Sequence, residues 1–246
     1  MSSSHAFRPI LLASLFLVCA TAPGGRLEDP KGQPTPASTT TNDQFRPILI
    51  NNIFNYYSNN GSGSYNPLST TQGGFEFPKG DRLTTVFQDG LVWGVRQRDT
   101  IKVGGSVYRH GIQAGRILVH GTSTTDPVAD DASLTTNRVY RVRRDIRPIG
   151  GVSDPGDARA AGELAILENE EVPLIGRYET VTASQLLQQY WDDWNGWPAS
   201  LGAPYADIDH NGSYDPMIDI PGPPMADAAL WYVANDMSSV RTQYLS

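Results

Sequence analysis

Short apolar runs separated by glycine, proline and polar turns occupy the chain from residue 45 to about residue 142. Some of these runs alternate apolar with polar residues, and others are brief and rich in β-branched residues. Both patterns are typical of strands. We therefore expect a mainly β protein with a few helices, built from antiparallel, β-sandwich-like sheets. The runs lie at residues 48–54, 83–87, 90–95, 101–103, 113–119 and 139–142.

After Pro148 the pattern becomes helical. Residues 157–168 are rich in Ala, Leu and Glu, and a firmer helix is expected to begin at Thr182, whose hydroxyl and Gln185 form a capping pair. Its apolar side chains recur at helical spacing up to Trp194, and Gly196 ends it. We expect this aromatic stripe to pack into the core, although stacked rings of this kind also bind carbohydrate.

The N-terminus has the pattern of a secretory signal peptide over residues 1–22, with Arg8 followed by an apolar stretch and small residues. Residues 23–44 are rich in Pro, Gly, Thr and Ser and predict a flexible linker. A lipoprotein acylated at Cys19 is the alternative. Both interpretations place the protein in the secreted fraction or on the outer cell surface, with no membrane span in the mature chain.

The remaining chain is expected to form a β-rich domain over residues 45–150 and a segment with a helix and a calcium loop over residues 151–246. The whole chain has 246 residues, of which 39% are hydrophobic, which is enough for a core, and its net charge of −7 disfavours nucleic acid as a partner. The basic run at residues 138–144 predicts an exposed strand face on which arginines alternate with buried valines. An anionic ligand is the alternative for this run.

The segment of residues 207–219 resembles a calcium loop in its spacing of oxygen donors. Ile218 occupies the place of the usual bidentate acid, so that Asp219 would act from a shifted position, and Gly212 supplies the sharp turn. Affinity would be weak, ~10⁻⁴–10⁻³ M, as in extracellular modules. A tight turn with solvated carboxylates is the alternative. The predicted metal ligands are Asp207, Asp209, Asn211, Ser213, Asp215 and Asp219.

We identify no catalytic residue or further cofactor in the sequence. The histidines His110, His120 and His210 are scattered, and Asp192 and Asp193 are adjacent, so they cannot flank one glycosidic bond from opposite faces.

Several motifs together resemble the N-terminal portion of large, uncharacterised secreted bacterial proteins that end in a C-terminal sorting domain of the type IX secretion route. The resemblance spans residues 45 to 240, implies a secreted or cell-surface location, and brings no activity with it. Since such proteins continue into further β-structure, we expect this chain to be a fragment. The motifs are Phe75-Glu-Phe-Pro-Lys-Gly80, Val86-Phe-Gln-Asp-Gly-Leu-Val-Trp-Gly94, Val103-Gly-Gly-Ser-Val-Tyr108, Trp194-Asn-Gly-Trp-Pro198, Gly202-Ala-Pro-Tyr-Ala-Asp-Ile-Asp209 and Trp231-Tyr-Val-Ala-Asn-Asp236.

These observations favour an exported, calcium-stabilised, non-enzymatic module of the cell surface or the extracellular space, with an extracellular protein or a glycan as its partner. The alternative is a fragment of a secreted hydrolase that acts on polysaccharide. That alternative requires a cleft with two carboxylates about 5–10 Å apart, lined by Trp93 or Trp197.

Overall fold

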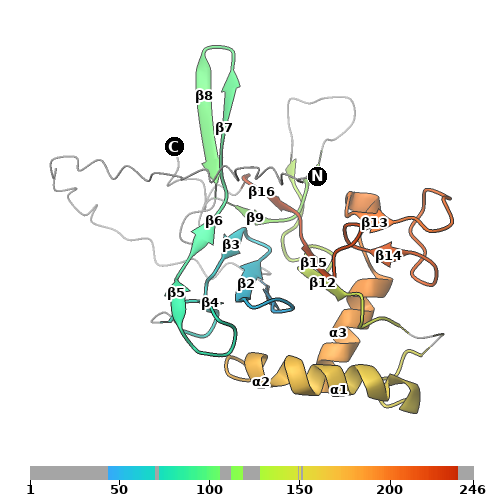
Figure 1. Cartoon of the computed structure of the whole chain (residues 1–246). Helices are drawn as coiled ribbons and strands as arrows, with labels where there is room; N and C mark the ends of the chain where they lie inside the picture. Colours follow the sequence, from blue (N-terminus) through green and yellow to red (C-terminus); the bar gives the residue numbers. More distant parts are fainter. Residues whose placement is uncertain are drawn as a thin grey trace, which may run out of the picture. The chain divides into compact units, whose positions relative to one another are not determined.

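The computed structural model describes residues 44–69, 72–105, 112–118, 128–148, 150 and 152–237. The predicted signal peptide, Cys19 and the linker up to residue 43 lie outside the described residues. The described part contains sixteen strands and three α-helices, which confirms the prediction of a mainly β protein with a few helices. Its strand pairs are antiparallel and form one six-stranded sheet and five two-stranded sheets (Figure 1). Sandwich-like packing of these sheets stays a prediction.

The six-stranded sheet is organised around β2 (Phe54–Ser58), which pairs with β1 (Phe45–Ile48), β3 (Ser62–Gly63) and β4 (Phe75–Glu76). The outer strands are β5 (Thr84–Val86) and β6 (Asp89–Gly90). Four of the five residues of β2 are buried, polar as well as apolar ones. This strand is therefore covered on both faces.

The polar segment that follows β2 is buried as well, and side-chain groups of Asn59 and Asn60 bond within the protein. The side chain of Asn59 donates from Nδ2 to the backbone oxygen of Asn137 at 2.8 Å, and Oδ1 of Asn60 accepts from the backbone N–H of Ser62 at 3.1 Å. Buried polar side chains need such partners to offset their loss of hydration. The short strand β3 lies within this buried segment.

The strands β7 (Val92–Gln97) and β8 (Thr100–Gly105) form a hairpin and, among the described strands, pair only with each other. Because side chains alternate between faces, Val92, Ile101 and Val103 share one face of the hairpin, and all three are exposed. In Figure 1 the hairpin extends away from the six-stranded sheet and the helices.

Of the four further strand pairs, two join consecutive strands and two join segments that are distant in sequence. The strands β9 (Gln113–Ala114) and β16 (Ala234–Asn235) pair with each other, as do β10 (Ile117–Leu118) and β11 (Val128–Ala129). The third pair is β12 (Tyr140–Arg143) with β15 (Ala228–Trp231), and the fourth is β13 (Tyr205–Ala206) with β14 (Ile220–Pro221).

The two predicted helices correspond to η1 (Ala158–Ala160) with α1 (Ala161–Glu170) and to α3 (Ala183–Asn195), whereas α2 (Val172–Ile175) and η2 (Ala199–Leu201) were not predicted. Both η1 and η2 are 3₁₀ helices, and η1 leads into α1. Thr182 and Gln185 form the predicted capping box at the start of α3, and Gly196 is its C-cap. The aromatic stripe of α3 is buried, which confirms its use in the core.

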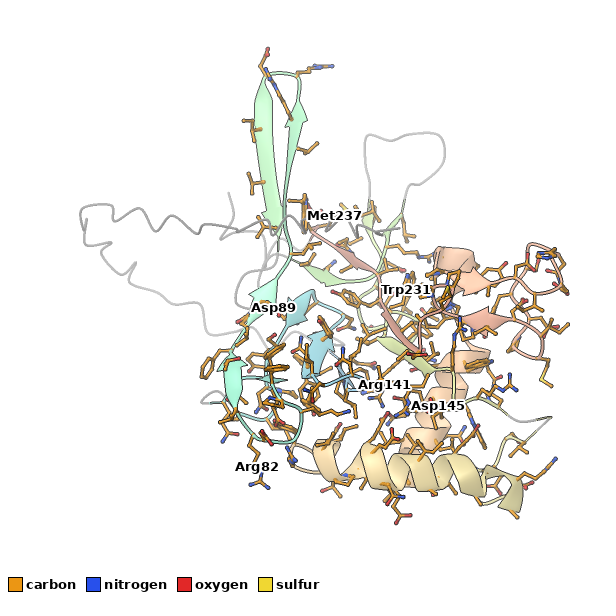
Figure 2. The ribbon with its side chains drawn as sticks, viewed as in Figure 1. Arg82, Asp89, Arg141, Asp145, Trp231 and Met237 are labelled. Atoms are coloured by element: carbon orange, nitrogen blue, oxygen red, sulfur yellow. The ribbon has the colours of Figure 1, made fainter. Side chains whose placement is uncertain are left out.

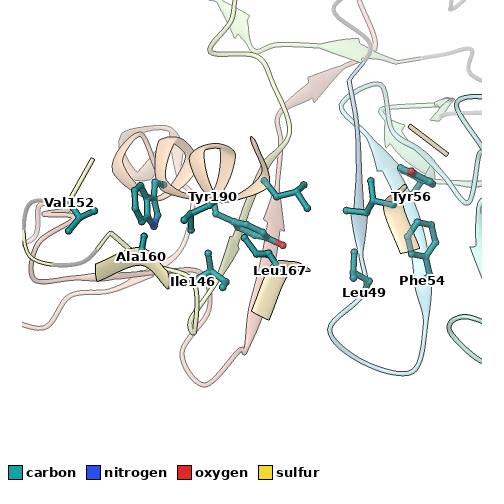
Figure 3. Packing of buried hydrophobic residues seen from close by; sticks show 12 residues of the cluster. Leu49, Phe54, Tyr56, Ile146, Val152, Ala160, Leu167 and Tyr190 are labelled. Atoms are coloured by element: carbon teal, nitrogen blue, oxygen red, sulfur yellow. The ribbon is translucent and has the colours of Figure 1, made fainter. Parts of the chain in front are cut away.

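One apolar cluster joins the sheet to the helices (Figure 3). Phe54 and Tyr56 of β2 belong to it together with Leu167 of α1 and Tyr190 of α3. Figure 3 shows Ile146, Leu167 and Tyr190 together in this cluster. The segments on either side of the predicted boundary at residue 150 therefore share a core.

The basic run contradicts its predicted exposure. Arg141 and Arg143 of β12 are only 4% and 3% exposed, so the exposed strand face predicted for residues 138–144 is wrong. Every residue of β12 is buried. The valine pattern alone predicts that only one face of this strand is covered, but α3 also packs against β12. Figure 2 places Arg141 in the interior of the described part.

The buried arginines are neutralised by carboxylates of the protein itself. Glu171, at the junction of α1 and α2, is fully buried, and its Oε1 lies 2.7 Å from Nη1 of Arg143 and accepts from the hydroxyl of Tyr190 at 2.8 Å. Its Oε2 lies 3.4 Å from Nη2 of Arg141. Nη1 of Arg141 also donates to the backbone oxygen of Pro47 at 3.0 Å, which ties β1 to β12. These contacts occupy the groups that an anionic ligand would need.

The substitution Glu171→Gln should lower the free energy of unfolding by about 3–5 kcal/mol, because it leaves two buried guanidinium groups without their shared carboxylate. Glu170→Gln is the matched control. Glu170 lies 2.9 Å from Nη2 of Arg143 but is 55% exposed, and its loss should cost about 0–1 kcal/mol. Urea unfolding of both variants measures the difference. Equal losses would show that the buried carboxylate has no special role.

Candidate metal centre

The predicted calcium loop is the connection of a short hairpin. Ala206 of β13 pairs with Ile220 of β14, so the residues just inside the ladder, Asp207 and Asp219, enter and leave the loop side by side. This pairing places Asp219, at the end of the loop, next to Asp207, at its start. The shifted position predicted for Asp219 is thus a consequence of strand register.

Three of the six predicted ligands come together. Oxygen atoms of Asp207, Asp209 and Asp219 all lie within 4.8 Å of one another, a spacing that fits one cation between them. Asp219 is buried, Asp207 is half-buried and Asp209 is exposed. The three carboxylates therefore have an inner side that is buried in the protein, at Asp219, and an outer side that is open to solvent, at Asp209.

Hydrogen bonds to backbone N–H groups hold these carboxylates in place. Asp219 accepts from Ile208 through Oδ1 and from Asp215 through Oδ2, both at 2.8 Å. Asp207 accepts from Gly212 at 2.9 Å, and the φ of +76° at Gly212 confirms that this residue makes the sharp turn. Each ionised carboxylate has about four acceptor sites, so these bonds leave lone pairs for a cation.

The other three predicted ligands have different contacts. Oδ1 of Asn211 accepts from the backbone N–H of Ser213 at 2.7 Å, and the side-chain nitrogen of Asn211 donates to Asp209. Oδ1 of Asp215 accepts from the backbone N–H of Met217 at 2.8 Å. Asn211 and Asp215 thus also shape the loop, and the carboxylates that converge are those of Asp207, Asp209 and Asp219.

Local contacts shift the pKa of Asp207 and of Tyr205. The backbone N–H of Gly212 lowers the pKa of Asp207, which keeps this carboxylate charged. Loss of hydration raises the pKa of Tyr205, and the charges of Asp207, Asp219 and Asp209 raise it further. Tyr205 therefore reports the negative potential of the site.

The loop is anchored to the end of α3. The hydroxyl of Tyr214 donates to the backbone oxygen of Trp194 at 2.7 Å, and Nε1 of Trp194 donates to the backbone oxygen of Pro216 at 3.0 Å. The ring of Tyr140 lies between two tryptophans, 6.4 Å from that of Trp197 and 6.2 Å from that of Trp231, with T-shaped geometry. A second apolar cluster therefore supports the loop.

A cavity of about 690 Å³ lies directly beside the loop. One wall consists of loop residues, and the others come from the end of α3, from η2 and from β12 and the segment before it. The sequence pattern did not indicate this cavity or the position of Tyr205 between it and the acidic group. Tyr205 and Tyr214 lie on either side of Asp207 and Asp209 in the sequence, which is the signal that could have indicated them.

The sequence predicts no chemical centre besides the calcium loop, and of the three scattered histidines only His210 lies in the described part. His210 is exposed in the loop with a φ of +59°, while His110 and His120 lie outside the described residues.

No protein-family model, curated protein or solved structure matches the chain. Within the described residues, the helices are too short or too polar to cross a membrane.

Without calcium, the substitution Asp219→Ala should lower the free energy of unfolding by about 1–3 kcal/mol, because it leaves two backbone N–H groups without an acceptor. Asp209→Ala, in the same loop but exposed, should change it by only about 0.5 kcal/mol. Urea unfolding in the presence of a chelator measures both. If both variants unfolded at the wild-type urea concentration, the hydrogen bonds of Asp219 to Ile208 and Asp215 would not stabilise the loop.

Proposed function

We propose that this protein is an exported module of the cell surface or the extracellular space that is stabilised by calcium and has no catalytic role of its own. The observation that carries the proposal is the convergence of the Asp207, Asp209 and Asp219 carboxylates within 4.8 Å of one another. Like charges so close together repel one another unless a cation lies between them.

The ligand type supports calcium as that cation. Calcium prefers several hard oxygen donors in a flexible shell and tolerates water in the remaining positions. The loop offers three carboxylates and an open outer side, which corresponds to a weak site of ~10⁻⁴–10⁻³ M. Such affinity matches calcium concentrations outside the cell.

The position of the loop supports a structural role for the ion. The loop connects β13 to β14 and is held to α3 by Trp194 and Tyr214, so an ion there would link the hairpin to the second apolar cluster. The N-terminal pattern supports export. The resemblance stated above supports a place at the start of a larger type IX secretion protein.

Calcium at 10 mM should stabilise the protein by about 1.4–2.7 kcal/mol relative to a chelator, which corresponds to a rise in melting temperature of about 3–10 °C. Asp207→Asn should remove most of this rise, whereas Asp227→Asn, at an exposed site outside the loop, should keep it. Magnesium should give a smaller rise because it demands stricter octahedral geometry. Scanning calorimetry measures the shift, and the same melting temperature in calcium and chelator would refute the calcium site.

Calcium should also lower the pKa of Tyr205. The three aspartates raise this pKa, and a bound divalent cation would neutralise their charge and so favour the phenolate at lower pH. NMR titration of ¹³Cζ-labelled tyrosine in calcium and in chelator measures the change, and Tyr205→Phe identifies the signal. The other tyrosine signals serve as internal controls. A pKa of Tyr205 that is the same in both conditions would place the ion elsewhere.

A further inference from the structure

We propose that the cavity beside the loop binds a neutral oligosaccharide. This inference deepens the proposed function by naming the class of partner, and it rests on that function only for the extracellular location. Its basis is a cavity of about 690 Å³, within the range of ~300–1,000 Å³ that small-molecule sites occupy.

The charges around the cavity favour a neutral ligand. Arg116 is the only charged residue among the described residues of the lining, and its Nε lies 3.1 Å from Oδ2 of the buried Asp130. The acidic loop forms one wall, so an anion would meet the field of Asp207 and Asp209. A cation would find no carboxylate among the described lining residues and would meet the positive charge of Arg116.

The uncharged part of the lining suits a sugar. Asn195, Ser200 and Ser213 are exposed and have amide or hydroxyl groups that both donate and accept hydrogen bonds, as vicinal sugar hydroxyls require. Tyr205 and Tyr214 are half-buried, with ring centroids 5.4 Å apart at an interplanar angle of 76°, and they provide apolar ring surface for the C–H face of a pyranose. A sugar ring needs both kinds of contact at once.

The walls of the cavity are fixed by contacts elsewhere in the protein. Nε1 of Trp197 donates to the backbone oxygen of Pro204 at 2.9 Å, and Tyr214 is bonded to Trp194. A preformed site of this kind avoids the entropy cost of ordering on binding. Since glycoside hydrolysis uses a pair of carboxyl groups and none lines the described cavity, the inference concerns binding alone.

The test measures binding of a panel of neutral hexasaccharides by isothermal titration calorimetry to the whole protein in 5 mM calcium. The panel contains β-1,4-, α-1,4- and β-1,3-linked glucose and β-1,4-linked mannose, and oligogalacturonate is the charged comparison. At least one neutral hexasaccharide should bind, and more tightly than oligogalacturonate. Tyr205→Ala and Asn195→Ala should each weaken its binding at least tenfold.

Asn169→Ala is the matched control, because Asn169 is also exposed near the end of a helix but lies in α1, away from the cavity. It should bind with wild-type affinity. Asn195 is exposed, so its variant keeps the test valid even where Tyr205→Ala fails to fold. The inference is overturned if no neutral hexasaccharide binds, or if binding is unchanged in Asn195→Ala. It is also overturned if a synthetic peptide of residues 33–43, rich in proline and threonine, binds and the sugars do not.

Repeating the titration in chelator separates this inference from the calcium proposal. Sugar binding that persists in chelator, in a protein without a calcium-dependent melting shift, would support the cavity and refute the ion site. A calcium-dependent melting shift without sugar binding would do the reverse.

Discussion

The fully buried carboxylate of Glu171 is the interaction on which the rest of the described structure depends. It lies between Arg141 and Arg143 of β12 and also accepts from Tyr190 of α3, so it joins a strand, two helices and the main apolar cluster. A guanidinium group in the interior is tolerated only when a carboxylate and further acceptors replace its water. The helices must therefore pack against β12 in the one register that places Glu171 between the arginines.

Local patterns in the sequence predicted the kinds of elements correctly, because their signals lie within a few residues. The capping box of Thr182 with Gln185 and the alternation of Ile101, Lys102 and Val103 in β8 are signals of this sort. The burial of Arg141 and Arg143 was beyond such patterns. An arginine that alternates with valine indicates an exposed face only where nothing covers that face, and here the covering carboxylate comes from a distant helix.

The residues of the candidate site also divide into those that local spacing predicts and those whose position depends on the folded chain. Asp207 and Asp209 were predicted from their spacing, since a loop of a few residues brings them together whatever surrounds it. The place of Asp219 depends on the pairing of β13 with β14, and the roles of Asn211 and Asp215 depend on which backbone N–H groups the folded loop presents to them. The neighbouring cavity could not be predicted, because its walls come from segments that meet only in the folded chain.

The pairing of β12 with β15 has a consequence for how the chain is made. Residues 140–143 leave the ribosome long before residues 228–231, and β9 waits in the same way for β16. Because these pairs close long loops, the two sheets that contain β12 and β9 can form only after most of the chain has been made. A polypeptide that reaches its final shape only after its late segments arrive stays incompletely folded for longer during synthesis, and its apolar segments stay accessible to chaperones for that time.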